Sequence, residues 1–116
     1  MDAEVKRKFA EFTKSLRTCR EMQEYEMADI ALHAAPEKVE KVDAFRKKNY
    51  RYQNSTSTEQ AGVHLELYKE REELRKDIVI DRYLNAELVL CRLLRQISLE
   101  ILNLAELHLD SLEDIL

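Results

Sequence analysis

Histidine and cysteine are the residues most often used for catalysis or metal binding, and their spacing in this chain supports neither. His33, His64 and His108 occupy unrelated positions, and Cys19 and Cys91 lie far apart with no Cys-x-x-Cys pair. A di-iron bundle would need Glu-x-x-His on two helices, and this motif is absent. We therefore predict no catalytic residue, no metal ligand, no cofactor and no enzymatic activity. The two cysteines are expected to behave as small buried hydrophobic residues.

A cluster of basic residues with aromatic neighbours offers a different chemistry. Three aromatic residues flank it, and basic side chains interleaved with aromatic rings can bind RNA through phosphate contacts and base stacking. Alternatively, the basic residues form a solvated helix face while the rings turn to the core, which is the favoured interpretation. The cluster consists of Arg46, Lys47, Lys48 and Arg51.

The overall charge gives no general attraction to nucleic acid. The chain carries 19 basic and 23 acidic residues, for a net charge of −4. A net negative charge favours solubility and repels a phosphate backbone. No DNA partner is expected.

Three polar residues occupy positions where the helical pattern calls for apolar ones. Asn49 lies between Phe45 and Tyr52, and Arg71 and Glu87 also lie among apolar neighbours. A buried carboxylate needs a partner, because burial otherwise makes it neutral. We predict a buried polar network of Asn49, Arg71 and Glu87, in which Glu87 pairs with Arg71 and fixes helix register rather than catalysing a reaction.

Helices must position all of these residues, and the first half of the chain predicts three. A seam of Val5, Phe9, Phe12 and Leu16 predicts a helix over about 3–17. Thr18 and Glu21 match a capping box that would start a second helix, ending near Ala34; an alternative is that the two run on as one bent helix. Pro36 suits the first turn of a third helix, which runs to about Tyr52.

The second half predicts a polar loop and two further helices. Residues 54–58 are small and polar, and Ser57 and Gln60 offer a second capping box for a helix to about Lys76. Asp77 is a candidate N-cap for a long last helix that reaches Leu107.

The last helix is apolar around most of its circumference. A helix that faces one partner needs an apolar stripe little wider than about 100°, and this one has roughly twice that. We therefore expect one side to contact its own chain and the other to contact a second chain. The predicted oligomer interface is Leu90, Leu94, Ile97, Ile101 and Leu104.

The composition sets the fold class. One glycine, one proline and 36% charged residues argue for helices with few tight turns. We predict an all-α fold of four to five helices, forming an antiparallel helical bundle with a long C-terminal helix that oligomerises. Residues 1–116 are expected to form a single helical domain.

The charged start of the chain and its short apolar runs also bear on location. Residues 1–8 are mostly charged, which does not match a secretory signal. The longest apolar runs are far shorter than the roughly 20 residues that a membrane span needs. The sequence therefore predicts a cytoplasmic protein with no membrane span.

Three stretches together carry a family resemblance. The first is Leu16–Glu26, which contains a Glu-Tyr pair, and the second is Ala35–Gln53, which contains Pro-Glu, Phe-Arg and Tyr-Gln pairs. The third is Ile80–Glu87, which contains Tyr-Leu and Ala-Glu pairs and leads into a hydrophobic helix. In this order and spacing, the chain resembles the YheA/YmcA/YlbF family of small helical bacterial regulatory proteins.

The resemblance implies regulation rather than catalysis. Members of the family self-associate or associate with paralogues in the cytoplasm. Two of them join a third protein in a complex linked to competence, biofilm formation, sporulation and RNase Y-dependent mRNA processing. By this resemblance, the chain is expected to be a homo-oligomer (dimer or tetramer) or a hetero-oligomer with paralogues, in contact with an RNA-processing complex.

The chain departs from the family pattern at its end. The multiprotein complex is associated with iron–sulfur clusters, and YlbF-like members can carry a cysteine-rich tail. This sequence ends in an acidic segment without cysteine. Because cluster ligation takes several thiolates, no cluster held by this chain alone is expected.

Overall fold

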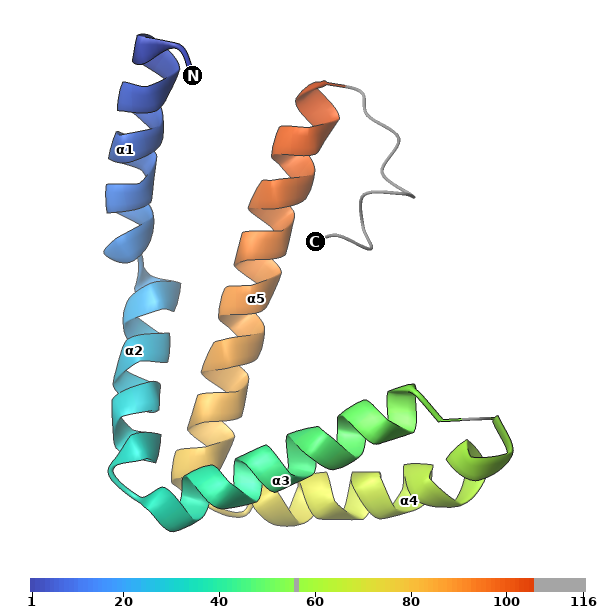
Figure 1. Cartoon of the computed structure of the whole chain (residues 1–116). Helices are drawn as coiled ribbons and strands as arrows, with labels where there is room; N and C mark the ends of the chain where they lie inside the picture. The colour runs from blue at the N-terminus through green and yellow to red at the C-terminus, as the bar shows by residue number, and fades with distance from the viewer. Residues whose placement is uncertain (56, 106–116) are drawn as a thin grey trace. The chain divides into compact units, whose positions relative to one another are not determined.

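In the part of the chain that it describes, the computed structural model contains five helices (Figure 1). It describes residues 1–55 and 57–105, and the side chains of all of these except 57–61. No strand occurs among these residues. The all-α prediction, with four to five helices, is therefore confirmed. The helices are α1 (Ala3–Arg17), α2 (Arg20–His33), α3 (Pro36–Gln53), α4 (Ser57–Leu74) and α5 (Ile78–Leu104).

The chain divides into two compact units. The first unit comprises Met1–Tyr25 and Ala86–Leu116, and the second comprises Glu26–Asn85. The boundary between the units falls within α2, after Tyr25, and within α5, after Asn85. The single-domain prediction for residues 1–116 stays a prediction.

The junction between α1 and α2 differs from the predicted capping box. The Thr18 hydroxyl turns back to the carbonyl oxygens of Lys14 and Ser15, at 3.3 and 3.2 Å, and so completes the end of α1. Helix α2 starts only at Arg20. The prediction that Thr18 caps α2 was wrong because its hydroxyl satisfies the free carbonyl groups at the end of α1. The sequence left open whether the two helices are separate, and the structure shows that they are, with α1 ending at Arg17 and α2 beginning at Arg20.

The core of the second unit begins at the turn from α2 to α3. Ala28 and Leu32 of α2 and Val42 of α3 are at most 2% exposed. Pro36 occupies the first turn of α3, where its missing N–H costs no hydrogen bond. The predicted start of the third helix is therefore confirmed.

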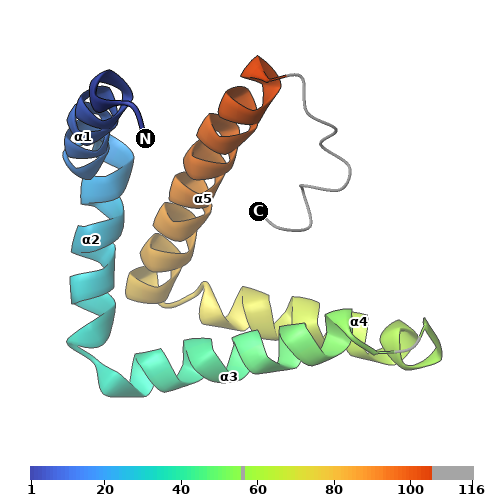
Figure 2. The same cartoon turned by 45° about the horizontal axis from the view of Figure 1, so that its top comes forward.

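Helices α3 and α4 lie side by side and run in opposite directions, as Figures 1 and 2 both show. Leu67 of α4 is buried, while Phe45 and Tyr52 of α3 are half-buried. Near the tip of the hairpin, the Tyr52 hydroxyl lies 3.1 Å from Nδ1 of His64. The antiparallel packing predicted for the chain is thus seen in this pair. The second capping box, at Ser57 and Gln60, lies outside the described side chains.

Asp77 begins α5, as predicted. Its Oδ1 accepts hydrogen bonds from the backbone N–H groups of Val79 and Ile80, at 2.9 and 3.4 Å. Lys38 of α3 lies 3.0 Å from Oδ2 of the same carboxylate. The side-chain hydrogen bond from Lys38 is the main cause that lowers the pKa of Asp77, although partial burial opposes it. One carboxylate therefore caps α5 and attaches α3 to it.

Replacing Leu32 with alanine tests the core. Leu32 is 2% exposed, and Leu32→Ala should lower the free energy of unfolding by about 2–5 kcal/mol through lost burial and an unfilled cavity. Ile30→Ala on the same helix is the matched control, since Ile30 is 73% exposed and its loss should change stability by less than about 0.5 kcal/mol. Urea unfolding followed by circular dichroism measures both, and equal losses would contradict the assigned core.

The Asp77 carboxylate should make stability depend on pH. Its pKa is lower in the folded chain than the usual value of about 3.9 in the unfolded chain, so the folded state prefers the charged form. Its stabilisation is complete above the unfolded value and is lost as the pH falls through the lowered pKa. Asp77→Asn should reduce stability at neutral pH and flatten its acid dependence. Asp43→Asn, at an exposed position of α3, should change neither.

Candidate functional site

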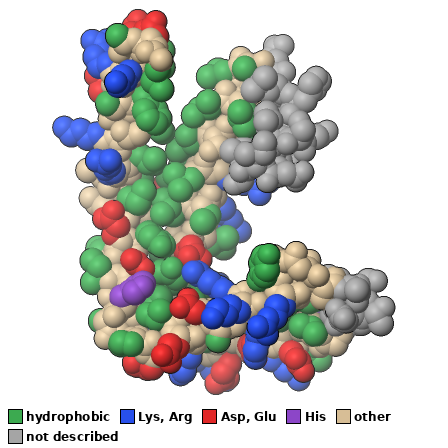
Figure 3. All heavy atoms as spheres, in the orientation of Figure 1, with side chains coloured by type: hydrophobic (Ala, Val, Ile, Leu, Met, Phe, Trp, Pro, Cys, Tyr) green, Lys and Arg blue, Asp and Glu red, His purple; other side chains and the backbone are tan. Residues whose placement is uncertain are grey.

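The first unit carries an open groove between α1 and the C-terminal part of α5. These two helices run in opposite directions (Figure 1), and hydrophobic side chains gather along the sides that face each other (Figure 3). The groove has a volume of about 700 Å³. Its apolar lining is Val5, Phe9, Phe12, Ile97, Ile101 and Leu104.

The sequence pattern explains why this groove is apolar. Val5, Phe9 and Phe12 follow one another at steps of four and three residues, which places them on one face of α1. Ile97, Ile101 and Leu104 repeat the same steps on α5. Three charged residues, Glu4, Lys8 and Glu100, complete the lining.

The groove remains largely open to solvent. Phe9 is 55% exposed, Phe12 40% and Ile101 56%. Large apolar side chains that line a concave surface and stay this exposed are typical of a protein contact site. The groove has the apolar lining that could receive an apolar stripe on a helix.

Three of the five residues of the predicted oligomer interface lie on this side of α5. Ile97, Ile101 and Leu104 line the groove and thus face α1 of their own chain. Leu90 is buried at 8% exposure, and Leu94 is 37% exposed. The sequence did not reveal that α1 shares this side. Contact with a second chain stays a prediction.

The four residues of the predicted RNA-binding cluster have different surroundings. Lys48 pairs with Glu70 of α4, and the Arg46 guanidinium lies 5.5 Å from the centroid of the Tyr83 ring. Lys47 and Arg51 are exposed. Two of the four thus make contacts with other helices of the second unit, and RNA binding by the cluster stays a prediction.

The predicted buried polar network needs a correction. Asn49 and Glu87 are half-buried, and Arg71 is exposed, with its guanidinium 5.6 Å from the centroid of the Tyr68 ring. None of the three is therefore buried. The long arginine side chain reaches solvent and stacks on an aromatic face of its own helix, so it needs no buried partner. Pairing between Glu87 and Arg71 stays a prediction.

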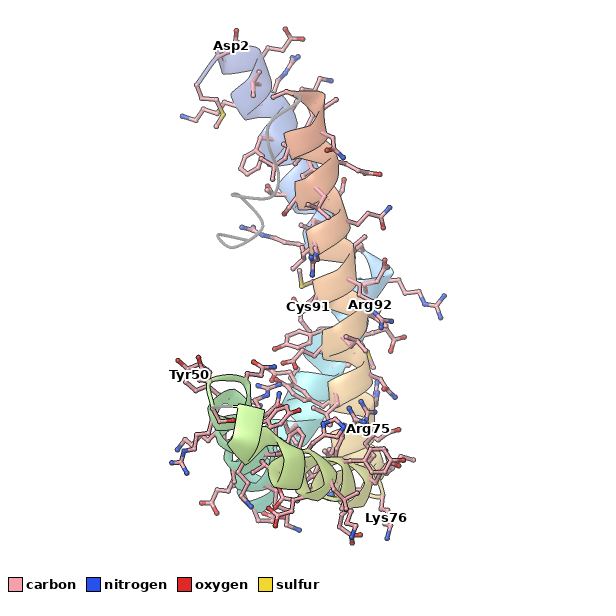
Figure 4. All side chains as sticks on the ribbon, turned by 90° about the vertical axis from the view of Figure 1, so that its right-hand side faces the viewer. Asp2, Tyr50, Arg75, Lys76, Cys91 and Arg92 are labelled. Atoms are coloured by element: carbon pink, nitrogen blue, oxygen red, sulfur yellow. The ribbon has the colours of Figure 1, made fainter. Side chains whose placement is uncertain are left out.

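A polar cluster at the start of α5 was missed. Arg75 Nη1 donates to Oδ1 of Asp81 at 2.7 Å and to Oδ1 of Asn85 at 2.8 Å. Figure 4 shows Arg75 beside the start of α5, whereas Lys76 lies on the opposite side of the end of α4. The signal in the sequence was the i, i+4 spacing of Asp81 and Asn85, which places both on one face of the last helix. These bonds join the residue after α4 to the first two turns of α5 within the second unit.

The positions of the histidine and cysteine residues bear on metal binding. Across the residues that the structure describes, no three His, Cys, Asp or Glu side chains could hold a metal ion together. His33 contacts Asp29 one turn earlier on α2, and His108 lies outside the described residues. Cys19 is half-buried and Cys91 is exposed, so the prediction of two buried cysteines was wrong. In the same described part of the chain, no helix has both the length and the apolar content of a membrane span.

Comparison with known proteins gives one family match. Residues 5–103 match the family described as "Control of competence regulator ComK, YlbF/YmcA". No curated protein matches the chain, and neither does any solved structure. The match begins at Val5 of α1 and ends one residue before the end of α5, so it includes both helices that form the apolar groove. Because it covers well over half of the sequence, the chain belongs to the YlbF/YmcA family of competence regulators.

Proposed function

We propose that this chain is a non-enzymatic helical adaptor that regulates its targets by protein–protein contact and associates with itself or with paralogues. The observation that carries the proposal is the apolar groove between α1 and the C-terminal part of α5. A regulatory family agrees with this mode of action. The groove supplies apolar binding energy and no reactive group.

The energetics favour a helical occupant of the groove. Burying a large apolar side chain stabilises a contact by about 1.5–3 kcal/mol. Phe9, Phe12 and Ile101 are each at least 40% exposed, so a partner that covers them gains part of this energy at every position. An amphipathic helix offers apolar anchors at i, i+3, i+4 and i+7, which match the steps of the lining.

The occupant that we propose is a helix of a second chain, from an identical copy or from a paralogue. The predicted interface supports this, since Ile97, Ile101 and Leu104 already line the groove. In the cell, the resulting assembly would contact an RNA-processing complex, as the family resemblance implies.

Adding a charge to the groove tests self-association. Ile101→Asp should lower the mass of the assembly in size-exclusion chromatography with light scattering, because an unpaired buried carboxylate is costly. Because Ile101 is 56% exposed in the single chain, the substitution should not disturb the fold, and the helical circular dichroism signal should stay unchanged. Asn103→Asp adds the same charge at an exposed position of α5 and should preserve the assembly. A wild-type chain that is monomeric at micromolar concentration would contradict the proposal.

RNA binding is the second candidate, and it rests on exposed residues near the end of α3. Tyr50 is 68% exposed and lies between the exposed Lys47 and Arg51. An aromatic ring beside two cations could stack a base and hold its phosphates. Lys48 and Arg46 support it less, because they contact Glu70 and Tyr83.

A direct binding measurement decides this candidate. Fluorescence anisotropy with a single-stranded oligonucleotide should show binding that weakens steeply as the salt concentration rises. Tyr50→Ala and the double variant Lys47→Glu/Arg51→Glu should each reduce it at least tenfold. No binding at low salt would dismiss RNA as a ligand of this surface.

A further inference from the structure

The α3/α4 hairpin has a second groove, whose charges are sorted by helix. Two adjoining hollows of about 340 and 420 Å³ run along one face of the hairpin, and Lys48 and Glu70 line both of them. Half-buried Phe45 and Leu74 lie in the floor of the first hollow, and Tyr52 and Val63 in that of the second. The two hollows therefore form one groove with an apolar floor.

The α3 side of the groove is basic. Every charged residue that α3 contributes to the lining is a cation, namely Lys41, Lys48 and Arg51. The spacing of seven and three residues keeps all three on one edge of the helix. We call this edge the basic wall.

The α4 side of the groove is acidic. Each charged residue that lines it from α4 or from the turn that follows is a carboxylate: Glu66, Glu70, Glu73 and Asp77. We call this edge the acidic wall. Within the chain, Lys48 pairs with Glu70 across the groove. Lys76, in the turn after α4, pairs with Glu73, and Lys38 of α3 pairs with Asp77.

From this sorting of charge, we propose that the face is a self-complementary docking surface for a second copy of the chain. A copy turned by 180° about an axis along the groove places its α3 over α4 of the first copy, and its α4 over α3. The basic wall of each copy then meets the acidic wall of the other, which gives the two equivalent contacts of an isologous interface. A two-fold axis across the groove would set α3 against α3, with like charges opposed.

The Lys48–Glu70 pair fixes the levels at which residues would meet. The pair shows that these two residues lie at the same height of the hairpin. Because the helices run in opposite directions, Arg51 is about one turn above that level on α3, and Glu66 is about one turn above it on α4. Under the proposed axis, Arg51 therefore faces Glu66 of the second copy, and Lys41 faces the Glu73–Asp77 end of its acidic wall.

This inference rests on the proposed self-association and assigns it a second surface, separate from the apolar groove of the first unit. The apolar floor supplies contact area, while the walls select the partner's orientation. Since five of the seven charged residues of the walls are exposed, namely Lys41, Lys48, Arg51, Glu66 and Glu73, the contact should weaken as salt screens their charges.

Charge reversal of each wall tests the inference. One variant (Lys41→Glu/Arg51→Glu) reverses two of the three cations of the basic wall, so that these positions oppose the acidic wall of a second copy with like charge. The other (Glu66→Lys/Glu73→Lys) reverses two of the four carboxylates of the acidic wall, so that these positions oppose the cations of the basic wall. Each variant alone should show a lower assembly mass than the wild type at low salt. Mixed one to one, they should restore the mass, because every wall again meets an opposite charge.

Matched controls separate this surface from other effects. Lys47→Glu/Lys69→Glu reverses two exposed charges that do not line the groove and should keep the wild-type mass. Lys48 and Glu70 are unchanged in every variant, which preserves the ion pair within the hairpin, and circular dichroism melting checks the fold.

The outcomes distinguish the two contacts. If the reversed variants keep the wild-type mass while Ile101→Asp lowers it, the self-association through the apolar groove stands and the hairpin contact is overturned. If the reversed variants lose mass and Ile101→Asp does not, the hairpin is the contact between copies and the apolar groove is not. A one-to-one mixture that fails to restore the lost mass would also overturn the inference, because opposite charges on the walls would then not be what holds the two copies together.

Discussion

The carboxylate of Asp77 is the point on which the second unit depends. It accepts hydrogen bonds from backbone N–H groups at the start of α5, and it forms an ion pair with Lys38 of α3. Because α4 ends three residues earlier, one side chain orders the meeting of three helices. Arg75, two residues before it, adds a second constraint through Asp81 and Asn85. Together these polar contacts attach the α3/α4 hairpin to the first two turns of α5.

The apolar burial is uneven along the chain. Among the described residues, the buried hydrophobic side chains belong to the second unit with the exception of Leu90. In the first unit, Phe9 and Phe12 on α1 and Ile101 on α5 remain at least 40% exposed. A two-helix contact cannot enclose side chains on three sides, so a unit of this kind gains most from a further helix packed into its groove. This is the physical reason to regard the apolar groove as an assembly element.

The sequence predicted the helices well because their signals are local. Pro36 and Asp77 act through the backbone next to them, and both were placed correctly. Thr18 was misplaced because a hydroxyl between two helices can bond forwards or backwards, and its sequence neighbourhood does not decide which. The pairing of Lys48 with Glu70 joins residues far apart in the chain, so it depends on the hairpin register, which periodicity alone leaves open.

The site was predicted only in part, for a related reason. The apolar stripe of the last helix was visible, but a stripe does not say which neighbour covers it, and Ile97 and Ile101 proved to face α1. The wide apolar circumference was taken to mean two packed sides, whereas part of it borders an open groove within one chain. A charged pattern has the same ambiguity. Arg46 and Lys48 are two residues apart, yet one lies over Tyr83 and the other pairs with Glu70. Helical geometry turns neighbours in sequence to different sides, so a basic cluster becomes a surface only where the tertiary structure leaves its members on one face.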